Sequence, residues 1–242
     1  EIEVNITTDQ PDADLEDDVC DVDANEPDQQ CSLRAAIETA NAKAGPDEIS
    51  FNIPGAGAHT ISPATELPVM FEKVLLDATT QPGYVDSPLI ELSGNGGFTG
   101  LTFDRGAFGS SVSGMAINRF FVGISITSSS VKIERNYIGL DPGGSPAGDV
   151  SVQQVGIAIR AGSADNTVGG IGNLGNVISN NTVGVEIGSG ATGNKILGNK
   201  IGTNPAGTLA TANETGVLLT FANENEIGDG VAGSGNIISG NA

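Results

Sequence analysis

The sequence predicts an all-β fold, a parallel β-helix in which short strands stack coil upon coil. An internal repeat supports this fold, because Asn176-Val-Ile-Ser-Asn180 returns sixty positions later as Asn236-Ile-Ile-Ser-Gly240. Asn136-Tyr-Ile-Gly139 matches Asn199-Lys-Ile-Gly202 in the same way, at an offset of 63. Three apolar segments lie within one such period, so the sequence predicts a solenoid with about 20 residues per coil.

Apolar residues alternate with other residues inside these segments, as they do in half-buried strands. Val183, Val185 and Ile187 are separated by a glycine and a glutamate, so the pattern predicts that these three side chains point into the core. Asn and Gly bracket each segment because both accept the backbone angles of a tight corner. Equivalent corners on successive coils would bring residues such as Asn176 and Asn236 into columns whose amides bond to one another.

Composition fits a long, narrow core rather than one filled by large aromatic side chains. The hydrophobic fraction is 38% but the aromatic fraction is only 4%, so Val, Ile, Leu and Ala are expected to fill the coils. No run of about 18 apolar residues occurs, and no transmembrane segment is expected. The sequence ends on Gly240-Asn241-Ala242 within the repeat pattern, and we therefore expect the native protein to carry further domains beyond it.

The charge of the chain is strongly negative and uneven. The 242 residues include 30 Asp and Glu but only 10 Lys and Arg, which gives a formal net charge of -20. Residues 1–30 alone contain 12 acidic residues and no Lys or Arg. Nucleic acid is not an expected partner, because few cations are present to replace the counterions of a phosphate backbone. Anionic polysaccharides and anionic lipid surfaces are disfavoured for the same reason unless a divalent cation bridges them.

The two cysteines, Cys20 and Cys31, lie eleven positions apart on either side of an acidic loop. A metal site would need more ligands, and a redox pair would need the closer C-x-x-C spacing. A structural disulfide is therefore expected, with two free buried thiols as the alternative. A disulfide implies an oxidising, extracellular compartment, and closing so short a ring contributes roughly 2 to 3 kcal/mol.

Asp21, Asp23 and Asn25 place oxygen-bearing side chains at alternate positions, which is the opening pattern of a calcium-binding loop. The rest of that pattern is missing, because Glu26 stands where glycine is required and Ser32 where glutamate is required. Two interpretations of the segment remain open: a Ca²⁺ site formed by these three residues, or a solvated acidic loop.

One helix is expected, over residues 32–44. Ser32 is suited to be its N-cap, and Leu33 and Ile37 begin an apolar face at helical spacing. An amphipathic helix ahead of a solenoid can cover the open apolar end of the first coil. We therefore expect an N-terminal cap, residues 1–46, and a parallel β-helix, residues 47–242, truncated at its C-terminal end; together they would form one structural domain.

The segment Cys31-Ser-Leu-Arg-Ala-Ala-Ile-Glu-Thr-Ala-Asn41 resembles the Cys-Ser-Leu-Arg-Glu-Ala signature near the start of large secreted bacterial β-helix proteins, with Ala35 in place of Glu. The resemblance continues through Gln81-Pro-Gly-Tyr84 to the Asn-x-Ile-Gly repeats, so it covers essentially the whole chain. It implies a right-handed parallel β-helix of the pectin-lyase-like fold with an N-terminal capping helix. It also implies a longer extracellular or cell-surface protein of adhesin-like character, and it brings no agreed catalytic residues.

A polysaccharide-active enzyme, a lyase or a hydrolase, is the alternative, because many parallel β-helices cleave polysaccharides. A lyase needs a Lys or Arg base and usually calcium to neutralise the uronate. The candidate residues are Lys132, Arg135 and Arg160 with Asp141 and Asp165. Lys132 has a repeat counterpart in Lys195, which is typical of a solvated face rather than a unique site.

Histidine and aromatic residues also bear on the choice of function. His59 is the only histidine and lies away from any Asp cluster, which is typical of a structural histidine and not of a hydrolase site. Trp is absent, so only Tyr84 and Tyr137 could serve as stacking platforms for sugars. We therefore expect a non-catalytic module of a secreted or surface-anchored bacterial protein that acts in adhesion or as a structural stalk. Its expected partner is a surface glycan or a protein ligand.

Overall fold

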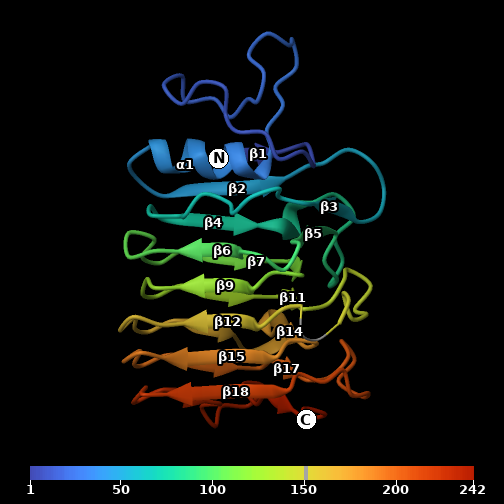
Figure 1. Cartoon of the computed structure of the whole chain (residues 1–242), viewed down its shortest axis with the longest axis vertical. Coiled ribbons are helices and arrows are strands. Elements are labelled where there is room, and N and C mark those ends of the chain that lie inside the picture. The colour runs from blue at the N-terminus through green and yellow to red at the C-terminus, as the bar shows by residue number, and fades with distance from the viewer. Residues whose placement is uncertain (150–151) are drawn as a thin grey trace.

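The computed structural model of the chain, which describes residues 1–149 and 152–242, is a parallel β-helix. Three sheets run along the long axis of the molecule, and their strands pair in parallel. Figure 1 shows the coils stacked from the helix at the N-terminal end to the last coil at the opposite end. The predicted fold class is confirmed.

Sheet A has eight strands in the described part of the chain. In order along the sheet they are β1 (Ile2–Val4), β2 (Asp47–Phe51), β4 (Val74–Asp77), β7 (Ser111–Ser113), β10 (Lys132–Glu134), β13 (Thr167–Gly169), β16 (Lys195–Leu197) and β19 (Glu226–Ile227). Consecutive rungs pair in register, so that Ile133 of β10 lies between Val112 of β7 and Val168 of β13.

Sheets B and C complete the coils. Sheet B consists of β3 (His59–Ile61), β5 (Ile90–Ser93), β8 (Met115–Asn118), β11 (Tyr137–Ile138), β14 (Val177–Ile178), β17 (Lys200–Ile201) and β20 (Ile237–Ile238). Sheet C consists of β6 (Thr99–Phe103), β9 (Val122–Ile126), β12 (Val155–Ile159), β15 (Val183–Gly188) and β18 (Thr215–Thr220). A regular coil therefore contributes one strand to each sheet, as β10, β11 and β12 do.

The coils are longer than the 20 residues that the sequence predicts. Lys132 follows its partner in the preceding coil by 21 residues, but Thr167 follows Lys132 by 35 residues. The repeat from Asn176 to Asn236 spans two coils, because Asn199 lies between them in the stack. One period contains three apolar segments. Residues 183–187 and 217–220 belong to β15 and β18, which are successive rungs of sheet C, and residues 196–201 contribute to β16 of sheet A and β17 of sheet B.

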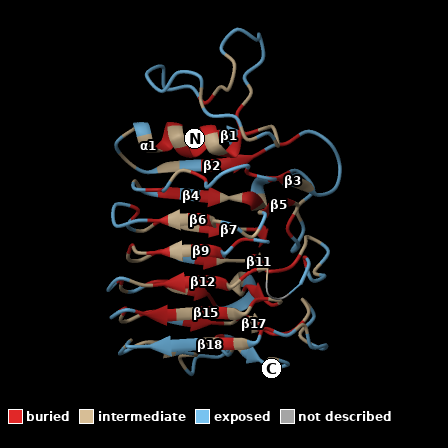
Figure 2. Cartoon of the chain, viewed as in Figure 1, coloured by how far each residue is buried: buried red, intermediate tan, exposed pale blue. Residues whose placement is uncertain are grey.

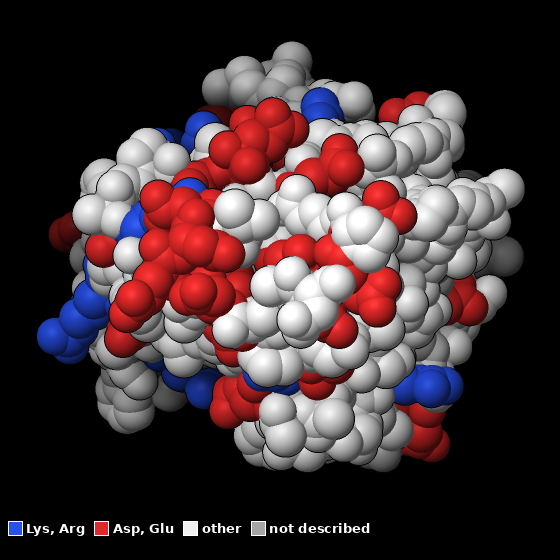
Figure 3. All heavy atoms as spheres, turned by 90° about the horizontal axis from the view of Figure 1, so that it is seen from above, with Lys and Arg blue, Asp and Glu red and all other residues white. Residues whose placement is uncertain are grey.

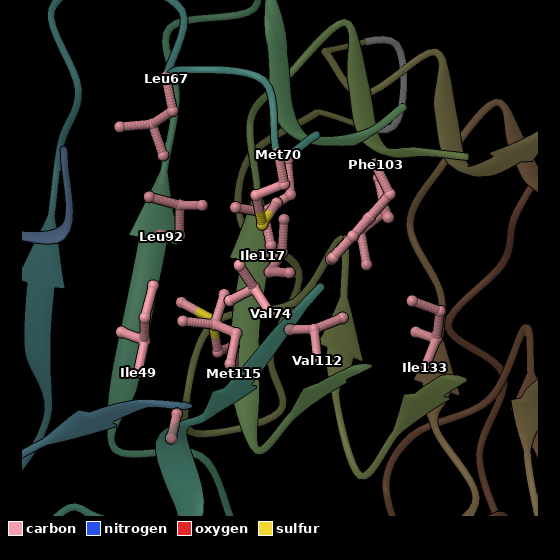
Figure 4. Packing of buried hydrophobic residues seen from close by; sticks show 14 of the residues in the cluster. Ile49, Leu67, Met70, Val74, Leu92, Phe103, Val112, Met115, Ile117 and Ile133 are labelled. Atoms are coloured by element: carbon pink, nitrogen blue, oxygen red, sulfur yellow. The ribbon is translucent and has the colours of Figure 1, made fainter. Parts of the chain in front are cut away.

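The inward-facing side chains of each sheet stack into apolar columns that form one continuous core. The sheet A column is Ile49, Leu76, Val112, Ile133, Val168 and Ile196, and the sheet B column is Ile61, Leu92, Ile117, Ile138, Ile178 and Ile201. Figure 4 shows members of both columns gathered in the interior between the sheets. Each fully buried Ile, Leu or Val contributes about 1.5–3 kcal/mol.

A glycine stands at the second position of every strand of sheet C. The column consists of Gly100, Gly123, Gly156, Gly184 and Gly216. A Cβ at Gly156 would lie 2.5 Å from the carbonyl oxygen of Gly184 and would also meet the side chain of Asn181. Glycine is therefore required here, because the backbones and the corner amides pack too closely for any side chain.

These glycines disturb the alternation of inward and outward residues. Val185 and Ile187 lie in the main core, as predicted. The prediction for Val183 is wrong, because its side chain packs with Val155 in a separate, smaller cluster. Gly184 is buried next to the buried Val185, so the simple period of two fails at this point.

Amide side chains form columns at the corners of the coils, as predicted. In the first column the Nδ2 of Asn176 donates to the Oδ1 of Asn199 at 2.9 Å, and that oxygen also accepts from the backbone N–H of Asn176. Each amide therefore satisfies a backbone donor of the neighbouring coil as well as the next amide. The columns are Asn136, Asn176, Asn199 and Asn236; Asn166, Asn194 and Asn225; and Gln153, Asn181, Asn213 and Asn241.

The helix α1 (Leu33–Ala42) covers the N-terminal end of the core, where it packs on β1 and β2 (Figure 1). Ser32 is its N-cap, as predicted, since its Oγ accepts a hydrogen bond from the N–H of Ala35 at 3.0 Å. Leu33 and Ile37 are completely buried. No helix in the described residues has both the length and the apolar character needed to cross a membrane.

A disulfide joins Cys20 to Cys31 and confirms the predicted pairing, with 5.3 Å between the two Cα atoms. It closes part of the acidic segment, which rises above the helix in Figure 1. Figure 3 views the molecule from this end and shows Asp and Glu side chains gathered over it. The cap thus carries much of the negative charge that the sequence concentrates in residues 1–30.

The two ends of the core differ in how they meet solvent. The helix closes the first end, whereas the last coil leaves apolar side chains exposed, and Figure 2 shows the second half of β18 in the exposed colour. The exposed set includes Leu218, Leu219, Phe221, Ile227, Ile237 and Ile238.

Candidate ligand-binding groove

A groove of about 400 Å³ lies against the outer face of sheet B. Its size is within the range of pockets that bind small ligands. Its lining contains both tyrosines of the chain and two of its 10 basic residues. Its lining includes the side chains of Tyr84, Asp86, Arg135, Tyr137, Lys200 and Pro205.

Strand register places three residues of the groove in one column. Tyr137 of β11 pairs with Val177 of β14, which pairs with Lys200 of β17. The residues that follow in these strands are buried isoleucines such as Ile138, and side chains alternate along a strand, so the column faces outward. Successive rungs are about 4.8 Å apart, and the Tyr137 ring and the Lys200 ammonium are therefore within reach of one small ligand.

Arg135 occupies a corner position that glycine takes in the next two coils. It precedes the first amide of its column, and Gly175 and Gly198 precede the next two. Arg135 has a φ of 59°, close to the 66° of Gly198, whereas Gly175 has a φ of -65°. A left-handed backbone costs a residue with a Cβ about 1 kcal/mol or more. Asp165, Asn180 and Glu224 also precede column amides with left-handed backbones, so this angle belongs to the corner. What distinguishes Arg135 is its long cationic side chain in the lining of the groove.

Tyr84 comes from the loop after η1 (Ala78–Thr80). Its N–H donates to the carbonyl of Gln81 at 3.0 Å, which closes the turn that the Pro-Gly pair predicts. Gln81 is buried and bonds to both backbone groups of Ile53, so the start of this loop is anchored to the core. Burial raises the pKa of the Tyr84 phenol above its ordinary value, and the charge of Arg135 offsets part of this effect.

The two cations of the groove have unused hydrogen-bonding capacity. The Nε of Arg135 is buried without a partner among the described residues, and its Nη2 makes only a 3.4 Å bond to Asn173. The Nζ of Lys200 donates to the carbonyl oxygen of Pro205 at 2.5 Å, which leaves further protons free. Neither cation forms a salt bridge within residues 1–149 and 152–242. A buried donor without an acceptor is costly. The two cations in the lining also have few partners, so the groove favours a ligand that brings acceptor oxygens.

The candidate residues for a lyase are not brought together. Lys132 projects from the outer face of sheet A, and Arg160 pairs with Glu186 on sheet C. Asp141 uses its Oδ1 to accept the N–H of Ser145 in its own turn, and Asp165 is exposed at the start of a different corner. Arg135 alone of this set lines the groove.

The candidate calcium residues lie in the acidic loop near the disulfide, away from the groove. The Oδ1 of Asp21 accepts the N–H groups of Asp23 and Gln30, and the Oδ1 of Asp23 accepts from the backbone and side chain of Asn25. The Asn25 side chain lowers the pKa of Asp23. Among the described residues no group of three or more His, Cys, Asp and Glu is arranged to bind a metal ion. Calcium binding by Asp21, Asp23 and Asn25 stays a prediction.

His59 lies in β3 and does not line the groove. Its Nε2 is buried and has no hydrogen-bond partner among the described residues. The side chain packs near Gly55, where an added Cβ would touch its ring at 3.4 Å. These surroundings place it with the early coils, as the sequence indicates.

The sequence indicated Tyr84 and Tyr137 as stacking platforms and Arg135 as a lyase candidate, and the structure places all three in one groove. Lys200 and Asp86 were missed at the level of the sequence. A signal for Lys200 was present, because the match of Asn136-Tyr-Ile-Gly139 with Asn199-Lys-Ile-Gly202 puts it at the position of Tyr137 two coils later. Asp86 follows an irregular turn and has no repeat counterpart, so no pattern could assign it.

No model of a known protein family matches this chain, and no curated protein matches it either. Its function is therefore inferred from the residues of the groove and their setting.

Proposed function

We propose that this chain is a non-catalytic β-helix module of a larger secreted or surface-anchored bacterial protein, and that it acts in adhesion by binding a surface glycan. The groove against sheet B is the observation that carries the proposal. It combines two tyrosine rings with two cations that have free donors on a small, concave surface. Aromatic faces for the apolar side of a sugar, with polar groups for its hydroxyls, are what saccharide recognition requires.

The strands under the groove are paired on both sides, so the side chains they carry are held in place before a ligand binds. Tyr137 and Lys200 stand on these strands. The corner beside them is fixed by the amide column that runs through Asn176. A rigid surface loses little conformational entropy when a ligand binds.

The dispersal of the lyase candidates weighs against the enzymatic alternative. Arg160 is engaged by Glu186, and Lys132 is on another sheet, so Arg135 is the one member of this set in the groove. Lys200 and Asp86 also line the groove, so the cleavage measurement below is what separates binding from lyase chemistry. Lyase chemistry needs a base and a charge-neutralising group at the same sugar unit. The Cys20–Cys31 disulfide is compatible with the extracellular location that adhesion requires.

The test is a panel of neutral and uronate-containing polysaccharides offered to the chain with calcium and with chelator. Retention on immobilised polysaccharide measures binding, and new reducing ends or unsaturated products measure cleavage. Retention without any product is the expected result. Product from any substrate would overturn the proposal in favour of a lyase or hydrolase. Neither retention nor product across the panel would overturn glycan adhesion in favour of the structural stalk.

A further inference from the structure

We infer that the groove takes a short saccharide bearing a carboxylate, held by Arg135 and Lys200, with a sugar ring against Tyr84 and Tyr137. The inference rests on the proposed glycan adhesion and specifies the chemical class of its ligand. It starts from an imbalance in the groove: two cations line it, against one carboxylate, that of Asp86.

Arg135 is the strongest indication of an anionic ligand. Its Nε is buried and unpartnered, while its Nη2 has only the distant Asn173 oxygen. The guanidinium presents its donors as a planar fork that matches the two oxygens of a carboxylate. The equivalent corners of the next two coils are glycines at which an added Cβ would lie 1.9 and 2.1 Å from a backbone oxygen, so a side chain is excluded there, whereas Arg135 is accommodated and lines the groove. A ligand carboxylate would supply the acceptor that the Arg135 side chain lacks.

Lys200 and the tyrosines complete the site. Lys200 stands two rungs from Tyr137 in the outward column and keeps donors free beside its bond to Pro205. Tyr84 stays protonated at neutral pH, because burial raises the pKa of its phenol, so it can donate to a sugar oxygen. Asp86 accepts hydrogen bonds and is suited to sugar hydroxyls.

The net charge of the chain limits the size of this ligand. A formal charge of -20 repels a long polyanion, and the sequence for that reason disfavours anionic polymers. Charges farther away than about 8 Å are largely screened at physiological ionic strength. One carboxylate on a short saccharide would therefore experience mainly the cations of the groove. A volume of about 400 Å³ also suits a short saccharide rather than a long chain.

The chain contains intrinsic fluorophores that report on ligand binding in this groove. It has 2 Tyr and no Trp, and both tyrosines line the groove. Tyrosine fluorescence of the whole chain therefore monitors the groove alone. The titration uses a glucuronate-glucose disaccharide and cellobiose, which differ only in the carboxylate, in the presence of a calcium chelator. We expect a saturable change with the acidic disaccharide and an affinity at least about tenfold lower for cellobiose.

Arg135→Gly is the decisive variant, because glycine occupies this position in the next two coils and suits its left-handed backbone. We expect it to melt at or above the temperature of the wild type and to bind the acidic disaccharide at least about tenfold more weakly. Lys200→Gln should weaken binding as well. Lys132→Gln removes the same charge from the exposed face of sheet A and should bind as the wild type does.

Three outcomes would overturn the inference. Equal affinity for the two disaccharides would exclude carboxylate recognition while leaving glycan adhesion in place. Unchanged affinity in Arg135→Gly would exclude Arg135 as the partner of the carboxylate. No binding of either disaccharide, by fluorescence and by calorimetry, would exclude this ligand class, and the polysaccharide panel would then decide separately whether the chain binds glycans at all.

Discussion

The first coils and the later coils of this β-helix satisfy their corner backbone groups in different ways. From residue 111 onward, columns of amides repeat from coil to coil, and each amide serves two neighbours. In the first coils the corners depend on single, unrelated side chains: Thr80 accepts the N–H of Phe51, Gln81 that of Ile53, and Ser110 that of Val74. The backbone groups at the corners are thus satisfied by repeated amides in the later coils and by individual, unrelated side chains in the first coils.

The cores of the two regions differ in the same sense. Phe51, Met70 and Phe103 are large, fully buried side chains of the early coils. The later coils stack Ile and Val, as in the column of Ile133, Val168 and Ile196. Repetition therefore makes the later coils regular, while the early coils depend on side chains matched to one place. The two regions should respond differently to the loss of a corner side chain.

The largest difference is expected between Asn176→Ala and Gln81→Ala. The Asn176 side chain makes four hydrogen bonds, with the backbone N–H and the amide of Asn136 and with the oxygens of Ile133 and Asn199. Gln81 makes two, both with Ile53. At about 1 kcal/mol per bond, the expected losses in the free energy of unfolding are about 4 and about 2 kcal/mol.

Denaturant titration of both variants measures these two losses. Asn95→Ala is a matched control, because this asparagine is exposed and its side chain accepts one hydrogen bond, from the N–H of Gly97 in its own turn. It should lose no more than about 1 kcal/mol. If Gln81→Ala proved as destabilising as Asn176→Ala, the amide columns would have no special role in the stability of the later coils.

The glycine column of sheet C gives the next largest effect. Gly156→Ala places a Cβ 2.5 Å from the backbone oxygen of Gly184, which has no flexible group that can move aside. Overpacking of this kind should cost about 3 kcal/mol. Gly235→Ala is a control without steric conflict or backbone strain, since nothing lies within 4 Å of its Cβ and its φ is not positive. A Gly156→Ala variant as stable as Gly235→Ala would show that the coils can separate to accept a side chain.

The contrast between the regions explains what the sequence could predict about the fold. The repeated Asn and the alternating Val and Ile gave the parallel β-helix, the amide columns and the inward residues of the later coils. The coil length was wrong because two coils of unequal length together make the sixty-residue repeat that the letters display. Val183 was placed wrongly because the close approach of Gly184 to the next backbone is a tertiary contact that no period of two contains.

The groove was less predictable than the fold, and its residues show why. Arg135 was a candidate from the sequence as a lyase cation, and Tyr137 was a candidate as a stacking platform. Tyr84 reaches the same place from a loop of the early, irregular coils, so its distance from Tyr137 depends on how that loop folds. Periodicity predicts which residues share a sheet, but it cannot predict where an irregular loop meets that sheet.

A smaller effect is expected in the cap. There a covalent link, and not repetition, stabilises the first end of the β-helix. Replacing both Cys20 and Cys31 by Ser removes a ring with a sequence separation of 11 and should cost roughly 2 to 3 kcal/mol. Hydrogen exchange should then rise in the acidic segment and in α1, while the later coils keep their protection. Equal loss of protection in both regions would mean that cap and coils unfold as one unit. Wild-type protein under reducing conditions is the control and should behave as the double variant does.

The smallest expected effect concerns Tyr84, where a loop of the early coils meets the later ones. Burial raises the pKa of this phenol in the folded chain above its unfolded value of about 10. Folding therefore binds the proton more tightly, and this contribution to stability is complete below pH 10 and is lost as pH rises through the folded pKa. The free energy of unfolding should fall more steeply above pH 10 in the wild type than in Tyr84→Phe. Tyr137→Phe, which leaves Tyr84 in place, should keep the steep fall. Parallel pH profiles for the wild type and Tyr84→Phe would mean that Tyr84 is solvated, and that the loop does not close over the groove.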